Sequence, residues 1–207
     1  MSIRMDYLPN HKDIKVYQDD EMFCINTDTM VLGEFLEVYK QDVVLDIGTN
    51  TGALMLYASL FNPRRLVGID INERALDLAK KNMEENHVKN YELYHADGNT
   101  FRLDEEVDVV IFNPPYFKTP NNDLGTNSYL ALAKHENNFS LESMVNCINR
   151  NLRNNGTVYF LFQTSVHQYG GSTEIRWIIR ISDEMIYLYY AILLCHGNGA
   201  PLQRSDF

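Results

Sequence analysis

The alternation of short apolar runs with amphipathic stretches constrains the fold of this chain more than any other feature. Runs rich in β-branched residues predict strands, and the stretches between them carry apolar residues at helical spacing. The predicted strands are Val43–Ile47, Leu66–Asp70, Tyr91–His95, Val107–Phe112 and Thr157–Phe162, and the predicted helices are Ala53–Phe61, Glu73–Asn86 and Ser140–Leu152. Because strands that alternate with helices form parallel βαβ units, we expect an α/β fold with a doubly wound sheet covered on both faces.

Residues 1–40 are predicted to form an N-terminal appendage that packs on the main domain, residues 41–207. Within the appendage, Val16–Gln18 and Met22–Ile25 could pair as a short hairpin. Thr27–Thr29 then offers N-cap chemistry for a helix.

The C-terminal part of the chain is predicted from weaker patterns. A helix is expected over Glu174–Ile181, followed by a last strand over Met185–Leu194. We expect this strand to run antiparallel to the others. The predicted sheet is therefore mostly parallel, with an antiparallel C-terminal strand.

The formal net charge of the chain is -10, and no segment is basic. A protein that binds nucleic acid mainly through its overall charge needs a basic surface. Any polyanion would therefore have to be held by a small local patch.

Several features favour a reduced, cytoplasmic compartment. The start, Met1–Tyr7, lacks the apolar region of a signal peptide, and the apolar run Met185–Leu194 is too short to span a bilayer, so no membrane partner is expected. The cysteines are scattered and form no CxxC pair: Cys24, Cys147 and Cys195. The six histidines have no zinc-ligand spacing, so no metal is expected either.

A glycine-containing turn joins the first strand to the first helix of the main domain. Its residues run from Asp46 to Gly52, and Gly48 and Gly52 permit positive φ and a close approach of a ligand to the backbone. Asn50 stands where another glycine would be expected. Since asparagine tolerates the left-handed conformation better than other non-glycine residues, the turn can keep its shape.

Acidic residues end the next two strands. Asp70, followed by Ile71, ends the second strand, and a carboxylate there can accept both hydroxyls of an adenosine ribose. The third strand leads into Asp97 and Gly98, and Asp97 could accept an adenine amino group. Each acid alone could be an ordinary loop residue, but the carboxyl ends of parallel strands meet at one edge, where such folds bind ligands.

The fourth strand ends in Asn113-Pro114-Pro115-Tyr116. Proline cannot donate to a strand ladder, so the chain must leave the sheet here in a stiff turn. The turn carries an amide side chain, a bare carbonyl at Pro114 and the ring of Tyr116. These groups suit a flat amino group, which needs two acceptors and a stacking surface. The alternative is an ordinary strand exit with a packing tyrosine.

Together, Asp46–Gly52, Asp70 and Asn113–Tyr116 resemble the motifs of Rossmann-like amino-methyltransferases. More closely, the chain resembles the bacterial tRNA adenine-N6 methyltransferases that modify the adenine beside the anticodon of valine tRNA. Phe23–Leu32 and Ala133–Glu136 match as well, and the resemblance runs from about Gln18 to Leu202. The chain departs from the family at Asn50, in a shorter segment from Ile181 to Leu194, and in lacking the family's tail.

The resemblance implies S-adenosylmethionine as cofactor and tRNA as partner. It assigns cofactor binding to Asp46, Gly48, Asn50, Gly52, Asp70, Ile71, Asp97, Gly98 and Asn113. It assigns catalysis to Asn113, Pro114, Pro115 and Tyr116, and substrate binding to Phe117, Lys118, Lys134 and His135. Given the acidic charge, we expect tRNA to be bound weakly by a local basic rim of Lys118, Lys134, Arg176, Arg180 and Arg204.

Four alternatives remain open at this point, and one of them is another nucleobase amino-methyltransferase. A protein glutamine-amide methyltransferase uses the same tetrapeptide for a similarly flat amide, and the acidic charge favours it. That class usually carries a helical N-terminal substrate domain, for which residues 1–40 are too short. A non-catalytic adenosyl-binding module is disfavoured by the intact Asn113–Tyr116. A dehydrogenase is disfavoured because Gly48–Gly52 does not follow the GxGxxG spacing. The oligomeric state cannot be predicted from the sequence.

Overall fold

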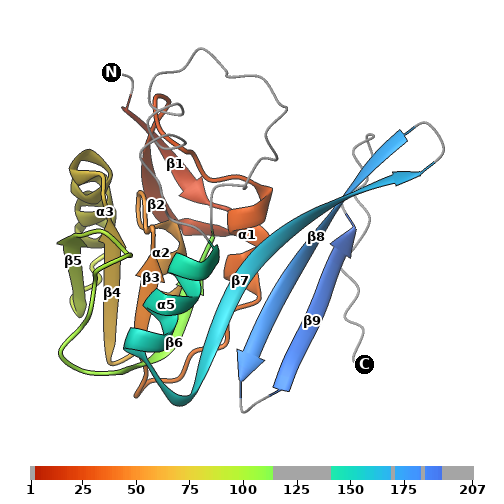
Figure 1. Ribbon diagram of the computed structural model, residues 1–207. Helices are drawn as coiled ribbons and strands as arrows, with labels where there is room; N and C mark the ends of the chain where they lie inside the picture. The colour runs from red at the N-terminus through yellow and green to blue at the C-terminus, as the bar shows by residue number, and fades with distance from the viewer. Residues whose placement is uncertain (1–2, 114–140, 169–170, 183–184, 193–207) are drawn as a thin grey trace.

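The computed structural model describes residues 3–113, 141–168, 171–182 and 185–192 and contains two sheets (Figure 1). The elements in chain order are β1 (Ile3–Leu8), β2 (His11–Asp19), α1 (Thr27–Glu34), β3 (Val43–Ile47), α2 (Ala53–Ser59), β4 (Arg65–Asp70), α3 (Glu73–Glu85), β5 (Tyr91–His95), β6 (Val107–Phe112), α5 (Leu141–Asn151), β7 (Leu152–Gln168), β8 (Gly171–Ser182) and β9 (Met185–Ile192). The larger sheet has the strand order β5-β4-β3-β6-β7-β8-β9, and β1 and β2 form the smaller one. Five strands of the larger sheet are parallel, which confirms the predicted fold class.

The strand order reverses beside β3. The chain proceeds from β3 to β4 and β5 on one side, then returns to place β6 and β7 on the other. In open α/β sheets this reversal leaves a crevice at the carboxyl ends of the strands, and ligands bind there. The predicted strands over β3, β4, β5 and β6 all lie at this part of the sheet, within one residue of their expected bounds.

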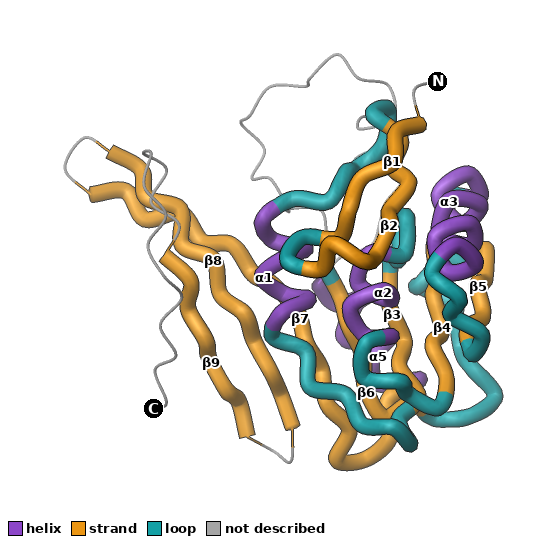
Figure 2. The backbone as a smooth tube through the Cα atoms, turned by 180° about the vertical axis from the view of Figure 1, so that it is seen from behind, coloured by secondary structure: helices purple, strands orange, loops and turns teal. Residues whose placement is uncertain are grey.

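Helices cover both faces of the sheet around β3, as Figures 1 and 2 show from opposite sides. On one face Val44 of β3 packs with residues of α1, α2 and α3. On the other, Leu45 and Ile47 pack with Met144 and Cys147 of α5. Because successive residues of a strand point to opposite faces, a strand covered on both sides is mostly apolar, which explains why every residue of β3 except Asp46 is apolar.

The N-terminal hairpin differs from the prediction. β1 pairs with β2 across a turn at Pro9–Asn10, where Asn10 adopts the left-handed φ of 64°. The predicted partner strand, Met22–Ile25, is not a strand and instead leads into α1, whose N-cap is Asn26. Patterning misses β1 because this strand exposes most of its side chains, so it lacks the buried face that marks a half-buried strand.

The predicted helix over Glu174–Ile181 is also wrong. This segment belongs to β8, which pairs antiparallel with β7, and β9 pairs antiparallel with β8 in turn. The segment is rich in isoleucine, and β-branched residues favour a strand when a neighbouring strand is available to pair with. The predicted last strand is confirmed as β9, ending at Ile192 rather than Leu194.

Asn82 of α3 and Asn86, the C-cap of this helix, attach the appendage to the main fold. The Asn82 side chain accepts a hydrogen bond from Tyr17 N (2.7 Å) and donates to Tyr17 O (3.0 Å) and to Thr51 O (2.8 Å). One helical turn later, Asn86 forms the same pair of bonds with the backbone of Lys15 (2.9 and 2.7 Å). The two amides thus complete the open edge of β2, and Asn82 ties β2 to the glycine-containing turn as well.

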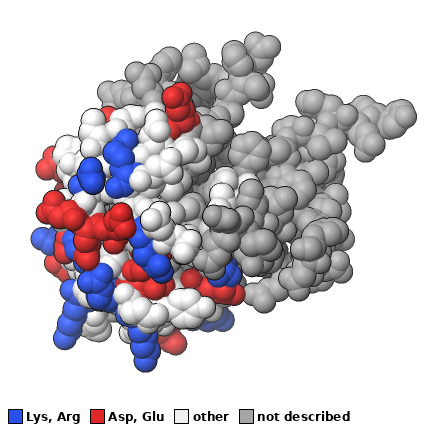
Figure 3. Space-filling model, turned by 60° about the horizontal axis from the view of Figure 1, so that its bottom comes forward, with Lys and Arg blue, Asp and Glu red and all other residues white. Residues whose placement is uncertain are grey.

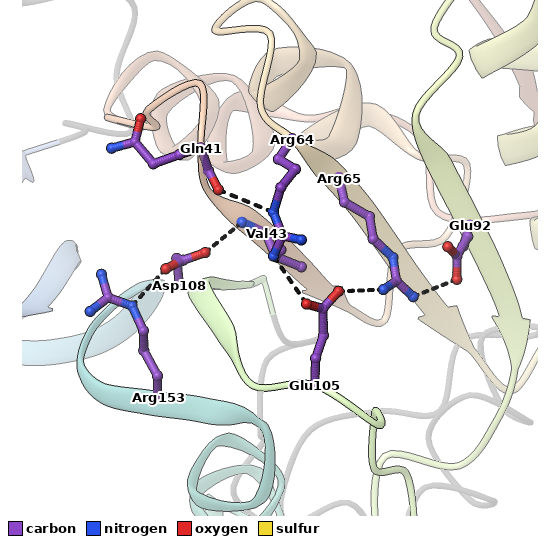
Figure 4. Close-up of polar contacts among 8 residues, drawn as sticks. All are labelled: Gln41, Val43, Arg64, Arg65, Glu92, Glu105, Asp108 and Arg153. Carbon is purple, nitrogen blue, oxygen red and sulfur yellow. Dashed lines mark hydrogen bonds and ion pairs between the residues drawn. The ribbon is translucent and has the colours of Figure 1, made fainter.

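Charges at the amino ends of the parallel strands are paired with one another (Figure 4). Glu105 bridges Arg64 (3.0 Å) and Arg65 (2.5 Å), and Arg65 also bonds Glu92 (2.6 Å). Asp108 accepts a hydrogen bond from Val43 N and pairs with Arg153. In the space-filling view of Figure 3, acidic and basic side chains of the described residues are intermingled on one face. Charge is therefore balanced locally at this edge of the sheet.

Within the ranges that the structure covers, no helix combines the length and the apolar character needed to cross a membrane.

Candidate functional site

The turn after β3 has the left-handed backbone that the sequence predicts. Gly48 and Gly52 have φ values of 70° and 78°, and Asn50 has a φ of 48°. Gly48 is exposed, and a Cβ atom added there would meet nothing within 4 Å. At Gly52 a Cβ atom would lie 3.2–3.3 Å from Met83 and Ala79 of α3. The first glycine therefore leaves an open approach to the backbone, and the second allows close packing of the turn on α3.

Asn50 joins three segments, which gives a structural reason for asparagine at this position. Its backbone N–H donates to Asp70 Oδ2 (2.8 Å), and its side-chain Nδ2 donates to Phe23 O (2.6 Å). The first bond links the turn to the end of β4, and the second links it to the segment that precedes α1. A glycine could keep the turn and the bond to Asp70 but would lose the link to Phe23.

Asp46 is a fully buried carboxylate that lacks a full set of partners. Thr49 Oγ1 donates to its Oδ2 (2.7 Å), whereas its buried Oδ1 has no hydrogen-bond partner among the described residues. Burial raises the pKa of Asp46 to about 7; the bond from Thr49 opposes this shift, and the nearby charge of Asp70 adds to it. A buried acceptor without a donor is costly, and such atoms concentrate where a ligand completes them.

Asp70 is half-buried at the end of β4, as predicted, and its two oxygens accept from backbone amides. Oδ2 accepts from Asn50 N and Oδ1 from Asn72 N (2.9 Å). Burial raises the pKa of Asp70, and the backbone hydrogen bonds oppose that shift. Each carboxylate oxygen has a second lone pair, so Asp70 can still accept hydrogen bonds from a ligand.

The residues after β4 and β5 form a shallower part of the same edge. Ile71 is exposed, and its carbonyl lies 2.8 Å from His95 Nε2. Asp97 is exposed, and its Oδ1 accepts from the backbone and side-chain nitrogens of Asn99 (2.8 and 2.9 Å). Gly98 is buried, and its carbonyl accepts from Arg150 (2.7 Å). Of these three residues, Asp97 alone has an acidic side chain, and that side chain is exposed.

Asn113 is brought next to the glycine-containing turn by strand pairing. Ile47 of β3 lies opposite Phe112 of β6, so Gly48 and Asn113 are the residues that follow this pair. The Asn113 side chain is half-buried, and its Nδ2 donates to Thr29 Oγ1 of α1 (3.3 Å). The structure therefore brings together Asp46, the turn, Asp70 and Asn113 at one edge of the sheet.

The two edges of the sheet differ in how their acids are satisfied. At the amino edge Glu92, Glu105 and Asp108 are paired with arginines (Figure 4). At the carboxyl edge, no lysine or arginine of the described ranges forms an ion pair with Asp46 or Asp70. This contrast favours the carboxyl edge as the place for a ligand that carries positive charge.

Several predicted site residues lie outside the described residues. They are Pro114, Pro115, Tyr116, Phe117, Lys118, Lys134 and His135, together with Arg204 of the predicted basic rim. Arg176 lies in β8, and Arg180 is the one rim residue whose side chain is described. It pairs with Glu37 (2.5 Å), so its charge is balanced by an acid of the appendage.

Sequence reasoning missed the contribution of the segment before and within α1. Phe23 supplies a carbonyl to Asn50, and Asn26 and Thr29 form a hydrogen-bonded chain that ends at Asn113. Thr29 appeared in the sequence only as a possible cap residue. The matching stretch Phe23–Leu32 was the one available signal that this segment belongs to the site.

The reversal of strand order, the left-handed turn and the two acids define a Rossmann-like α/β protein, a class of fold that binds ligands at the carboxyl edge of its sheet. Residues 13–168 match the model of the methyltransferase small domain family. The chain belongs to this family.

Individual relatives agree with this assignment. A tRNA1(Val) (adenine(37)-N6)-methyltransferase of Flavobacteriaceae bacterium (strain 3519-10) is 34% identical over 52% of this chain and 48% of its own length. One of Vibrio campbellii is 28% identical over 72% of this chain and 63% of its own length. The chain thus spans about half of the length of the first relative and less than two thirds of the length of the second.

Among solved structures, the chain is similar to a SAM-dependent methyltransferase from Thiobacillus denitrificans in complex with S-adenosyl-L-homocysteine. The TM-score is 0.52 and the identity 17%, over 71% of this chain and 52% of the other. At this identity the likeness concerns the fold.

Proposed function

We propose that this protein is an S-adenosylmethionine-dependent methyltransferase that acts on the exocyclic N6 of an adenine in tRNA. The particular target we propose is the adenine beside the anticodon of valine tRNA, which is the activity that the names of the two relatives describe. The observation that carries the proposal is the position of Asn113. Asn113 directly follows β6 and lies beside the glycine-containing turn and the two acids.

The described residues fit the proposed cofactor. Its two positive charges, on the sulfonium and the ammonium group, suit an edge where Asp46 and Asp70 have no paired cation among the described residues. The unpartnered Oδ1 of Asp46 can accept a hydrogen bond, and Asp70 retains lone pairs for the ribose hydroxyls. The open backbone at Gly48 leaves room for the close approach of the amino-acid portion.

In this reaction the residues of the chain act mainly by positioning the acceptor amine. The cofactor supplies an electrophilic methyl group. The acceptor amine is a poor nucleophile because its lone pair is delocalised into the ring, so it must be held in line and its growing positive charge stabilised. In the proposal, Asn113 Oδ1 and the Pro114 carbonyl accept the two amine N–H groups, and both dipoles favour that charge. The extra proton leaves to water, so no protein base is required.

The remaining proposed roles concern the acceptor base. Tyr116, with Phe117, would stack on the extruded adenine, since aromatic rings bind flipped bases in this way. His135 would shape the pocket, and Lys118 and Lys134 would contribute to the basic rim. Because the net charge is -10, we expect tRNA binding to be weak and to fall steeply with salt.

A direct assay tests this proposal. S-adenosylmethionine labelled in its methyl group is incubated at low salt with unmodified bulk tRNA in one tube and with peptide-release factor in another. We expect label in the tRNA, and N6-methyladenosine after its digestion to nucleosides. Label in the release factor with none in the tRNA would move the protein to the glutamine-amide class, which the acidic charge favours.

A further inference from the structure

The carboxamide of Asn113 forms a hydrogen bond with α1. Its Nδ2 donates to Thr29 Oγ1 (3.3 Å), across 84 residues of chain. Thr29 lies in the first turn of α1, on the segment that also reaches the glycine-containing turn through Phe23 and Asn50. The appendage therefore contacts the very side chain to which the proposed chemistry assigns the acceptor amine.

The hydrogen bonds around Thr29 have a defined direction. The backbone N–H of Thr29 donates to the Asn26 side chain at 2.9 Å. Because a backbone N–H can only donate, the atom of Asn26 that it meets must be the carbonyl oxygen, Oδ1. The Thr29 hydroxyl lies 3.1 Å from the same oxygen. That oxygen can only accept, so the hydroxyl hydrogen points toward Asn26.

This direction extends to Asn113. With its hydrogen directed at Asn26, Thr29 Oγ1 presents lone pairs to Asn113, and the group of Asn113 that meets it must be the NH₂ group. The carbonyl Oδ1 then lies on the other side of the carboxamide. If the Asn113 carboxamide were flipped, its Oδ1 would face the lone pairs of Thr29 Oγ1, and two acceptors would meet. Its NH₂ group would then point to the side that Oδ1 now faces.

We propose that Thr29 and Asn26 are positioning residues that fix the orientation of the Asn113 carboxamide. This inference rests on the proposed function, in which Asn113 Oδ1 accepts an N–H of the target amine. An amine offers hydrogens, so an Asn113 flipped by 180° would meet it donor to donor and could not hold it. The chain of bonds from the Thr29 backbone through Asn26 and the Thr29 hydroxyl keeps the acceptor facing the substrate. The appendage thus orients the group that accepts the target amine, in addition to packing on the main domain.

The test removes the hydroxyl without changing the shape of the side chain. Thr29→Val is expected to lower kcat about 10-fold, the equivalent of one lost hydrogen bond. The KM for tRNA and the affinity for S-adenosylhomocysteine should change less than 2-fold, because orientation rather than binding is lost. Thr29→Ser keeps the hydroxyl and should restore kcat. Thr27→Val makes the same chemical change at an exposed position of the same helix and should have no effect.

Two further measurements distinguish a change in the orientation of the Asn113 carboxamide from a general effect of Thr29→Val on the fold. In the Asn113→Ala background, Thr29→Val should cause no additional loss, because Thr29 acts through Asn113. In ¹⁵N-asparagine-labelled protein without substrate, the side-chain NH₂ signals of Asn113 should shift in Thr29→Val and not in Thr29→Ser.

The outcomes distinguish this inference from the proposed function. A parent protein that methylates no tRNA would contradict the proposed function, while the NMR shift would still report the orientation of Asn113. An active parent in which Thr29→Val keeps full kcat would overturn the inference. An equal loss from Thr29→Val with and without Asn113 would overturn it as well.

Discussion

Asn113→Ala is expected to slow methyl transfer by about 10²–10³ while leaving cofactor affinity nearly unchanged. The estimate corresponds to the loss of one preorganised polar group at a developing charge. Cofactor affinity should persist because Asp46, the glycine-containing turn and Asp70 remain intact. Single-turnover rates with saturating tRNA, together with calorimetry of S-adenosylhomocysteine binding, measure the two quantities separately.

Tyr116→Ala provides the contrast to this variant. If Tyr116 stacks on the target base, its removal should weaken substrate binding by about 1–3 kcal/mol and leave the transfer step much less affected. Full turnover in Asn113→Ala, or equal kinetic effects of the two changes, would contradict the roles proposed for these residues.

Asp46→Asn is expected to stabilise the protein at pH 8 when no cofactor is present, and to weaken cofactor binding. Burial raises the pKa of Asp46 from 3.8 to about 7 in the folded protein. A group whose pKa is raised on folding contributes its full stability below its unfolded pKa and loses that stability as pH rises through the folded pKa. Between about pH 4 and pH 8 the parent therefore loses up to about 4 kcal/mol through this group, at roughly 1.4 kcal/mol per pKa unit.

An asparagine does not titrate, so the variant avoids this loss. It should exceed the parent in free energy of unfolding at pH 8 by a margin of that order, reduced by any weakening of the bond from Thr49, and the margin should vanish near pH 4. Denaturant unfolding of both proteins at the two pH values checks this. A difference that is the same at both pH values would show that Asp46 does not titrate as its burial implies.

The parallel part of the sheet could be predicted because β3, β4 and β6 are covered on both faces and their central residues are therefore mostly apolar. The turn was predictable for a related reason: Gly48 and Gly52 sit where a strand ends and a helix begins, and Asn50 is the next-best residue for a left-handed φ. In these elements local propensity and tertiary environment agree.

Where local and tertiary preferences diverge, the sequence misleads. β8 has isoleucines at spacings that fit a helix or a strand, and the pairing with β7 that decides between them is not visible in its own residues. β1 exposes Ile3, Met5 and Tyr7, so its apolar residues give no buried face from which to predict a strand.

The site was predicted as a list of acids and glycines at strand ends, and the structure brings its described members together. The hydrogen bond between Thr29 and Asn113 and the unpartnered Oδ1 of Asp46 could not have been predicted. Both depend on which distant segments meet at the edge of the sheet, and composition and spacing carry no information about that. The appendage was accordingly predicted as a covering element and not as part of the site.

The most direct measurement is a crystal structure of the protein with S-adenosylhomocysteine bound. We expect density across the carboxyl edge of β3, β4 and β6, with the ribose hydroxyls within about 3 Å of Asp70 as hydrogen-bond donors. We also expect the former sulfonium sulfur to face the side chain of Asn113. A ligand bound away from this edge, or bound there with its sulfur directed away from Asn113, would show that the proposed cofactor site is wrong.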